Sequence, residues 1–337
     1  MDKTGAECFV YAKACGLLAK SFTGSRAAAL FDARSLSELW TLLFRTQAPL
    51  VPEVMLAGQI ERAAFSSFIG DYTCFVEQFD RPDGILTEQL RMYEVEDLKE
   101  VGAALCSGEQ ECPPLIELGK FTTLDFSKWP DIKRITENSP YSWYDSVPGA
   151  HEQQKTEFRL DVQTVRAIWN AANCVRGDGS GALVSLYRDE YVMKNIVWAL
   201  RLRINYQMSD DEILSRLFFV TGTRAAAKDP LAGPAVQLLS RKTDLYDEWR
   251  DWKYAEFLNP HEEGSIWSVD PVWIERMSRI RQNRTAGKIF RQYPMTTAAL
   301  IAWFKMKSFE LSCIRTAVES LRLNVPGGEA MEAVGVS

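Results

Sequence analysis

The sequence has few of the residues that most active sites and metal sites use. It contains two histidines, His151 and His261, and each stands in a polar stretch with no second histidine or cysteine at ligand spacing. This pattern favours solvated surface histidines over a metal ligand or a general base. Seven cysteines occur at scattered positions without a CxxC pair. A disulfide framework and a zinc cluster are therefore both disfavoured, and we expect reduced thiols.

Catalytic motifs are also missing. The sequence has no GxSxG or HExxH motif. The glycine-rich stretch at 177–181, GDGSG, lacks the Lys-Ser/Thr pair and the preceding strand of a phosphate-binding loop, so we interpret it as a connection between two helices. We predict no catalytic residue, no metal ligand and no cofactor. A helical enzyme that works through paired carboxylates is kept as a third hypothesis, because the sequence alone cannot pair them.

Long apolar runs and basic clusters are absent as well. No segment approaches the ~20 apolar residues that a membrane-spanning helix needs, and the first 16 residues have no apolar core of the signal-peptide type. The charge is mildly acidic, with 39 basic against 45 acidic side chains and a net charge of −6. These features predict a cytoplasmic protein that binds no nucleic acid non-specifically and does not dock on lipid through a polybasic patch.

Helical patterns dominate what is present. Apolar residues recur at spacings of three and four, for example over 36–43, which is typical of one helix face. Long windows of strand-like alternation are missing, although a short strand within the first fifty residues after residue 209 is kept as an alternative. Capping signals predict helix starts at Asp161, at Asp270 with Pro271 in the first helical position, and at 209–212, where Ser and Glu form a capping box.

One short helical motif occurs three times in the chain. The copies are MYEVEDLKEVGAAL at 92–105, EYVMKNIVWALRLR at 190–203 and SFELSCIRTAVESL at 308–321, about a hundred residues apart. In each copy, which we name a repeat motif, an Asp, Asn or Cys stands directly before an aliphatic residue. The spacing predicts three copies of one helical unit. Chance similarity between helices is the alternative.

The repeat motifs divide the chain into three predicted helical lobes. Lobe 1 is expected at 1–112, lobe 2 at 113–208 and lobe 3 at 209–324, with a flexible tail at 325–337. Ten tryptophans and other clustered aromatic residues supply the burial that such small lobes need, and we assign most of them to the cores. Some of them are candidates for anchors to a partner.

The repeat motifs resemble the E-x-x-N-[IL]-[RK] pattern of the subunit named C in V-type (archaeal and bacterial A-type) ATP synthases, whose counterpart in vacuolar ATPases is the subunit named d. The opening of the chain, with LLAKSF at 17–22, is similar to that family too. The resemblance covers about residues 8 to 324. Two copies have Asp or Cys in place of Asn, and one has Val in place of Glu. The positions concerned are Glu94, Asp97, Lys99, Val192, Asn195, Glu310, Cys313 and Arg315.

This resemblance implies an all-α fold with three similar helical lobes in a pseudo-threefold, funnel-shaped arrangement. It implies a non-enzymatic central-stalk subunit on the cytoplasmic face of the membrane, without direct lipid insertion. The partners would be the proteolipid subunits of the rotor ring and the subunits of the central shaft, and the complex would couple ion transport, such as that of hydrogen ions, to ATP synthesis or hydrolysis. A cytosolic helical-repeat scaffold for protein partners is the alternative. The residues expected to contact partners are Glu94, Asp97, Lys99, Asn195, Arg201, Glu310 and Arg315.

Overall fold

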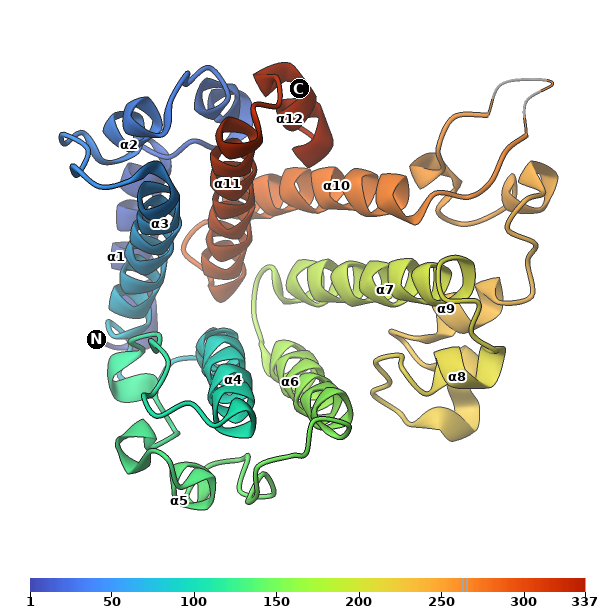
Figure 1. Cartoon of the computed structure of the whole chain (residues 1–337), viewed down its shortest axis with the longest axis horizontal. Coiled ribbons are helices and arrows are strands. Elements are labelled where there is room, and N and C mark those ends of the chain that lie inside the picture. The colour runs from blue at the N-terminus through green and yellow to red at the C-terminus, as the bar shows by residue number, and fades with distance from the viewer. Residues whose placement is uncertain (262–263, 265, 337) are drawn as a thin grey trace. The chain divides into compact units, whose positions relative to one another are not determined.

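The computed structural model of the chain describes residues 1–261, 264 and 266–336, and its regular elements are helices throughout (Figure 1). The predicted all-α class is confirmed, and the described residues form no strand. The α-helices are α1 Lys3–Leu18, α2 Leu36–Phe44, α3 Glu53–Val76, α4 Gly84–Ser107, α5 Ile132–Thr136, α6 Gln153–Cys174, α7 Ser180–Ile204, α8 Asp210–Leu214, α9 Gly233–Leu238, α10 Pro271–Gln292, α11 Thr297–Leu323 and α12 Gly327–Val334. The short 3₁₀ helices are η1 Gly24–Leu30, η2 Gly119–Phe121, η3 Phe126–Lys128, η4 Thr223–Lys228, η5 Tyr246–Trp249 and η6 Ala255–Phe257.

The chain forms two compact units. Unit 1 comprises Met1–Lys3 and Ile69–Arg176, and unit 2 comprises Thr4–Phe68 and Gly177–Ser337. Unit 1 contains the first repeat motif, on α4, and unit 2 contains the other two, on α7 and α11. The division into three lobes stays a prediction.

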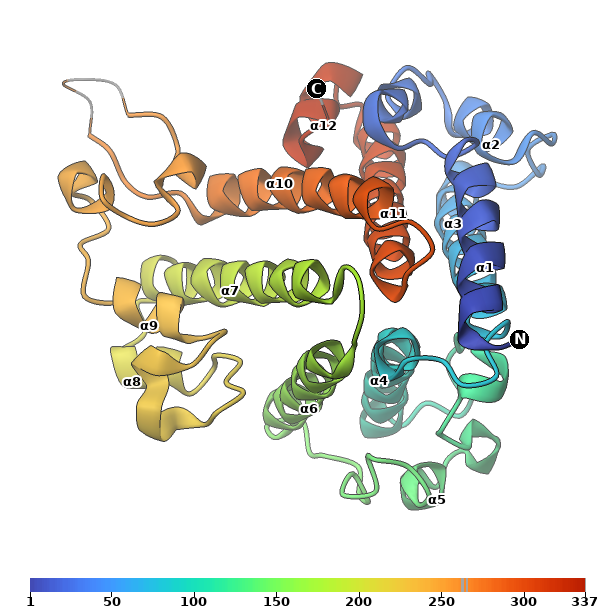
Figure 2. The same cartoon turned by 180° about the vertical axis from the view of Figure 1, so that it is seen from behind.

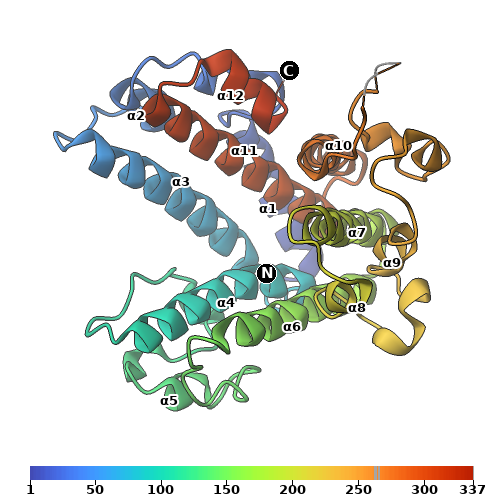
Figure 3. The same cartoon turned by 45° about the vertical axis from the view of Figure 1, so that its right-hand side comes forward.

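In unit 1, helices α4 and α6 lie side by side (Figure 3). Val95 and Leu98 of α4 share a core with Leu160 of α6, and Ile132 and Ile135 of the short helix α5 complete it. Burial of these apolar side chains stabilises the unit by removing their surface from water. The segment between α4 and α6 is thus folded back onto α4 as a small helical subdomain.

In unit 2, α7 and α10 lie side by side, and α11 follows α10 after a short turn (Figures 1 and 2). The segment between α7 and α10 forms a second small subdomain, whose core includes Trp249 and Trp267. A separate core joins α11 to η1, α2 and α3. Helices α3 and α11 also meet through buried aromatic rings: that of Phe68 lies 6.1 Å from that of Trp303 and 4.9 Å from that of Phe304, measured between centroids. All three long helices with repeat motifs therefore carry a small subdomain.

Two of the three predicted capping signals are confirmed. The Asp270 carboxylate accepts the backbone N–H of Val272 at 2.8 Å ahead of Pro271, and Ser209 forms the predicted capping box with Glu212. The prediction for Asp161 is wrong, because α6 already begins at Gln153. The Asp161 carboxylate instead pairs with a lysine of α4, so its acidic side chain serves a contact between helices and not a helix end.

The last residues of the chain differ from the predicted flexible tail at 325–337. They contain α12, in which Ala330 and Val334 are 5% and 2% exposed and pack in the core around α11. The two side chains are one helical turn apart, so they share one apolar face, which the burial stabilises. Gly327 begins this helix against the carbonyl oxygen of Phe31, where a side chain would not fit. Of the helices in the described part of the chain, none combines the length and the apolar character that crossing a bilayer requires.

Candidate functional site

The first repeat motif anchors the segment that follows its helix. Glu94 of α4 is 1% exposed, and its carboxylate accepts the backbone N–H groups of Thr123 and Leu124 and the hydroxyl of Thr123, the last at 2.7 Å. One turn later, Asp97 accepts the backbone N–H of Ile116 at 2.9 Å. Buried carboxylates of this kind replace the water that the loop backbone gives up on folding. Helix α4 thereby holds the start of its small subdomain.

Asp97 has an unusual electrostatic environment for an aspartate. It is 2% exposed, and this burial raises its pKa to about 7, opposed by the hydrogen bond from Ile116 and reinforced by the negative charges of Glu100, Glu94 and Glu96. Burial disfavours the charged form, and like charges nearby disfavour it further. Asp97 therefore takes up a proton near neutral pH.

The second repeat motif uses a neutral amide at the same position. Asn195 of α7 is fully buried, and its amide nitrogen donates to the carbonyl oxygens of Phe218 and Leu231, each at 3.1 Å. Its amide oxygen accepts the backbone N–H of Phe218 at 2.8 Å. The side chain thus joins two loop segments on either side of η4, and these three hydrogen bonds all go to backbone groups. Helix α7 holds its subdomain as α4 does.

Asp229 takes the role that glutamate has in the first copy, where α7 has Val192. Its carboxylate accepts the backbone N–H groups of Val220 at 2.9 Å and Thr221 at 2.8 Å, and those of Leu231 and Ala232 at 3.0 and 2.9 Å. Although burial by itself raises it, these hydrogen bonds hold the pKa of Asp229 below its ordinary value. Asp229 escapes prediction from the sequence because it lies in the subdomain and not in the repeat motif.

The third repeat motif anchors the beginning of the chain. Glu310 of α11 is 4% exposed and accepts the backbone N–H of Phe22 at 2.5 Å. The ammonium group of Lys307 bonds both Glu310 and the hydroxyl of Ser21, the latter at 3.0 Å. Cys313, at the position of Asp97 and Asn195, is fully buried, and burial raises the pKa of its thiol to about 12. The N-terminal segment 21–44 is thus the small subdomain of the C-terminal repeat motif.

The anchored segments repeat as well as the helices. The stretch FTGSRAAAL at 22–30 matches VTGTRAAAK at 220–228 in most positions, and the two form η1 and η4. Gly24 and Gly222 both have positive φ, 61° and 88°, a backbone conformation that glycine adopts at no steric cost. This second match was a signal in the sequence for the anchored loops. It indicates that the N-terminal segment held by α11 corresponds to the segment held by α7, so one repeat combines the two ends of the chain.

The basic residues of the repeat motifs link each long helix to a neighbour. Lys99 of α4 binds Asp161 of α6 at 2.5 Å, Arg201 of α7 binds Glu275 of α10 at 2.6 Å, and Arg315 of α11 lies 3.9 Å from Glu61 of α3. Each acidic partner stands on the helix that follows the anchored subdomain. Lys99 and Arg315 stand two residues after the central position of their motifs, so these two ion pairs have matching places. Arg201 stands six residues after Asn195, one helical turn further along, and reaches the corresponding neighbouring helix from there.

The structure places the seven predicted partner contacts in two groups. Glu94, Asp97, Asn195 and Glu310 are buried and bind their own loops, so the chain itself uses their polar atoms. This corrects their expected placement on a contact surface, since a carboxylate or amide can satisfy a buried backbone donor as readily as a partner. The basic side chains are 15% exposed in Lys99, 32% in Arg201 and 60% in Arg315. Partner contact stays a proposal for these three.

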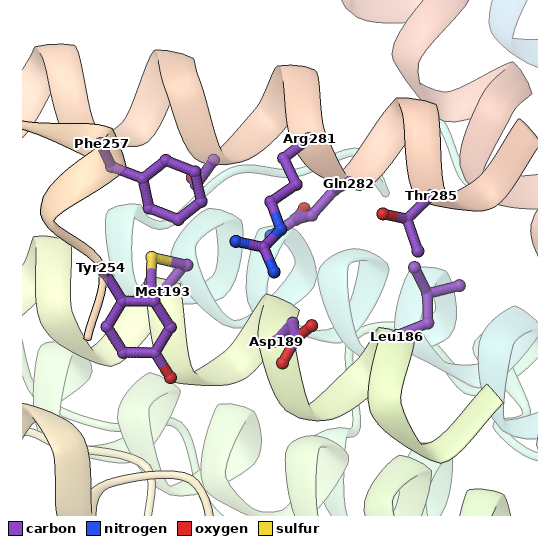
Figure 4. Close-up of a pocket in the computed structure, with 9 residues that line it drawn as sticks. Leu186, Asp189, Met193, Tyr254, Phe257, Arg281, Gln282 and Thr285 are labelled. Atoms are coloured by element: carbon purple, nitrogen blue, oxygen red, sulfur yellow. The ribbon is translucent and has the colours of Figure 1, made fainter. Parts of the chain in front are cut away.

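A small cavity of about 20 Å³, open to solvent, lies between α7 and α10 (Figure 4). Met193 of α7 and Tyr254 and Phe257 from the subdomain form one side of it, and Asp189 and Arg281 project into it from α7 and α10. The Arg281 guanidinium also pairs with Glu256. With its charges balanced and its walls largely apolar, the cavity has the character of a packing defect between two helices, and it offers no pair of groups for acid–base catalysis.

The described residues contain no group of three or more His, Cys, Asp or Glu placed to hold a metal ion. Among known proteins, the model of a family described as ATP synthase (C/AC39) subunit matches residues 10–332. An uncharacterized protein of Treponema pallidum (strain Nichols) is 29% identical over 326 residues, which is 95% of this chain and 94% of that protein. Both similarities run through all three repeat motifs and their anchored subdomains.

Proposed function

Because the chain belongs to the ATP synthase (C/AC39) subunit family, we propose that it is the central-stalk subunit that couples the rotating shaft of a V-type ATPase or synthase to the membrane rotor ring. The subunit would transmit torque and would carry out no chemistry itself. The observation that carries this proposal is the family match over residues 10–332. The anchored repeats support it, because three long helices each hold a folded segment through buried hydrogen bonds.

Rigid units suit a part that transmits torque. A coupling subunit loses work if its surface loops yield before the ring turns. In this chain each small subdomain is fastened to a long helix by buried hydrogen bonds, from Glu94, Asn195 and Glu310. Buried networks of this kind rigidify the groups that they join. Three similar lobes, as the sequence predicts, would also offer three similar surfaces to a ring of identical subunits.

The proposed place is peripheral, on the cytoplasmic face of the membrane, with the ring proteolipids on one side and the shaft on the other. Ring and shaft would be held by protein contacts without lipid insertion. Ion transport, including that of hydrogen ions, would then be coupled to ATP synthesis or hydrolysis by the complex as a whole. A free cytosolic scaffold would need neither partner, so the two functions differ in a measurable way.

The test is to assemble the rotary complex with and without this chain. We expect that complexes lacking it hydrolyse ATP but do not pump ions, and that adding the purified chain restores pumping. The same preparation, precipitated through a tag on this chain, should contain ring and shaft subunits. Equal pumping with and without the chain would refute the proposal, as would a tagged chain that binds neither ring nor shaft.

A further inference from the structure

Helix α10 concentrates positive charge in a chain whose net charge is −6. It has six basic residues and one acidic residue, Glu275. Three of the six are paired within the chain: Arg276 with Glu332, Arg279 with Glu275 and Arg281 with Glu256. The remaining three are Arg284, Lys288 and Arg291. They are exposed, and no acidic group in the described part of the chain pairs with them.

These three residues lie on one face of α10. Their spacing of i, i+4 and i+7 places side chains above one another along a helix, over about 10 Å of its axis at 1.5 Å per residue. The opposite face is buried through Ala286, Ile289 and others. We name the row formed by Arg284, Lys288 and Arg291 the α10 stripe. It is a continuous cationic surface and not three scattered charges.

The local structure around the stripe suits carboxylates. Arg284 lines an open cavity of about 200 Å³ together with Asn283 and Ser25. Amide, hydroxyl and guanidinium groups there can all donate hydrogen bonds, and guanidinium forks fit a carboxylate with two bonds. At the other end, the Arg291 guanidinium lies over buried Gly287, with its nitrogen 3.7 Å from the place of a Cβ atom.

We propose that the α10 stripe docks an acidic helix of a protein partner, with carboxylates at i, i+3 or i+4, and i+7 along one face. The partner's carboxylates pair with the three cations, and the one at the Arg284 end enters the cavity beside Asn283 and Ser25. The inference goes beyond the proposed function, because it specifies a surface and a partner chemistry that hold whether or not the chain belongs to a rotor.

Charge complementarity favours a protein helix over other anions. A long polyanion such as nucleic acid would extend beyond the stripe, and there the net charge of −6 of the chain repels it. Lipid binding by a helix face requires exposed apolar side chains to insert. The exposed large apolar residues of this region, Val272 and Met295, lie outside the stripe. A short row of three cations matches the length of two to three turns of a partner helix.

The probe for the test is a synthetic helical peptide with glutamates on one face at the stated spacing. An isomer of the same composition with its glutamates distributed around the helix is the control ligand. Binding of the full chain is followed by fluorescence anisotropy at low salt. We expect the one-faced peptide to bind at least about tenfold more tightly than the isomer, as three surface ion pairs of about 0.5 kcal/mol each imply.

The matched variants are R284E/K288E/R291E and, as control, R34E/R62E/K228E, which changes the charge equally at exposed positions outside α10. The stripe variant should lose the preference for the one-faced peptide, and the control variant should keep it. If the reversal lowers the Tm, R284Q/K288Q/R291Q serves in its place. Equal binding of both peptides, or equal losses in both variants, would overturn the proposal. So would stripe-dependent binding to vesicles of phosphatidylserine and phosphatidylcholine without binding of the peptide.

Discussion

The replacement Asp97→Asn tests the loop anchors most sharply. Asp97 is 2% exposed with a pKa raised to about 7, whereas an aspartate in an unfolded chain has a pKa of about 3.9. Between pH 4 and 7 the folded chain keeps a proton on Asp97 that the unfolded chain has released. The free energy of unfolding therefore falls as pH rises through this window and stays lowered above it.

The size of the effect follows from the pKa difference. About three pKa units at about 1.4 kcal/mol each set an upper value near ~4 kcal/mol. Glu94, Glu96, Glu100 and Cys112 are the titratable groups that interact with Asp97, and the first three carry like charges. An asparagine keeps the oxygen for the Ile116 N–H and removes the charge, as Asn195 does at the matching position of α7. We expect the Asp97→Asn variant to be more stable by about 1–3 kcal/mol at pH 8 and equal to the parent at pH 4.

Hydrogen exchange of the segment 112–124 is the suitable assay, because it reports local opening of the anchored loop and does not require both units to unfold together. The control is Asn195→Asp, which removes the amide donors to the carbonyl groups of Phe218 and Leu231. It should lower the free energy of opening of the segment 218–232 by about 3 kcal/mol at pH 8. The reasoning is refuted if the pH dependence of protection over 112–124 is the same in the parent and the Asp97→Asn variant.

Three further outcomes follow from the same contacts. Asp229→Asn should lower the free energy of unfolding by about 2 kcal/mol at pH 7, because a carboxylate that accepts several backbone N–H groups is replaced. Since the pKa of Asp229 in the folded chain lies below its ordinary value, this cost should shrink as pH falls from about 4, where the unfolded chain begins to bind the proton, through the lower pKa of the folded chain; pH-dependent urea unfolding measures it. Glu310→Ala should expose 21–44 to limited proteolysis while cleavage elsewhere stays slow, and unchanged cleavage would argue against the anchor. Arg315→Glu, at a 60% exposed site, should weaken assembly with partners and leave the Tm within about 1 °C, whereas Lys99→Glu should lower the Tm because Lys99 is 15% exposed and paired with Asp161.

Local sequence patterns predict much of the fold. Helix periodicity predicts the all-α class, and the caps at Asp270 and Ser209 come from short-range hydrogen bonds that three or four residues encode. Asp161 shows the limit of this reasoning. The residue type suits an N-cap, yet its partner is Lys99, which lies far away in sequence and close in space. A cap signal is decided by tertiary contacts when such a partner exists.

The repeat motifs were visible in the sequence, but their role was not. An acidic or amide residue on a helix is usually exposed, so Glu94 and Asn195 were expected at a partner surface. Burial depends on which loop folds over them, and the loop ligands of Asn195 lie 23 and 36 residues further on. Near the C-terminus, α11 holds the N-terminal segment that begins at Phe22, and this depends on contact between the two ends of the chain. In the sequence, the match of 22–30 with 220–228 was the feature that indicated this contact between the two ends.

The central claim is that this chain joins a shaft to a rotor ring. The most direct measurement is cryo-electron microscopy of the membrane complex purified through a tag on the chain. We expect density for the chain between the ring and the shaft, in contact with both. Density at the periphery of the complex, or a purified chain with no ring attached, would contradict it.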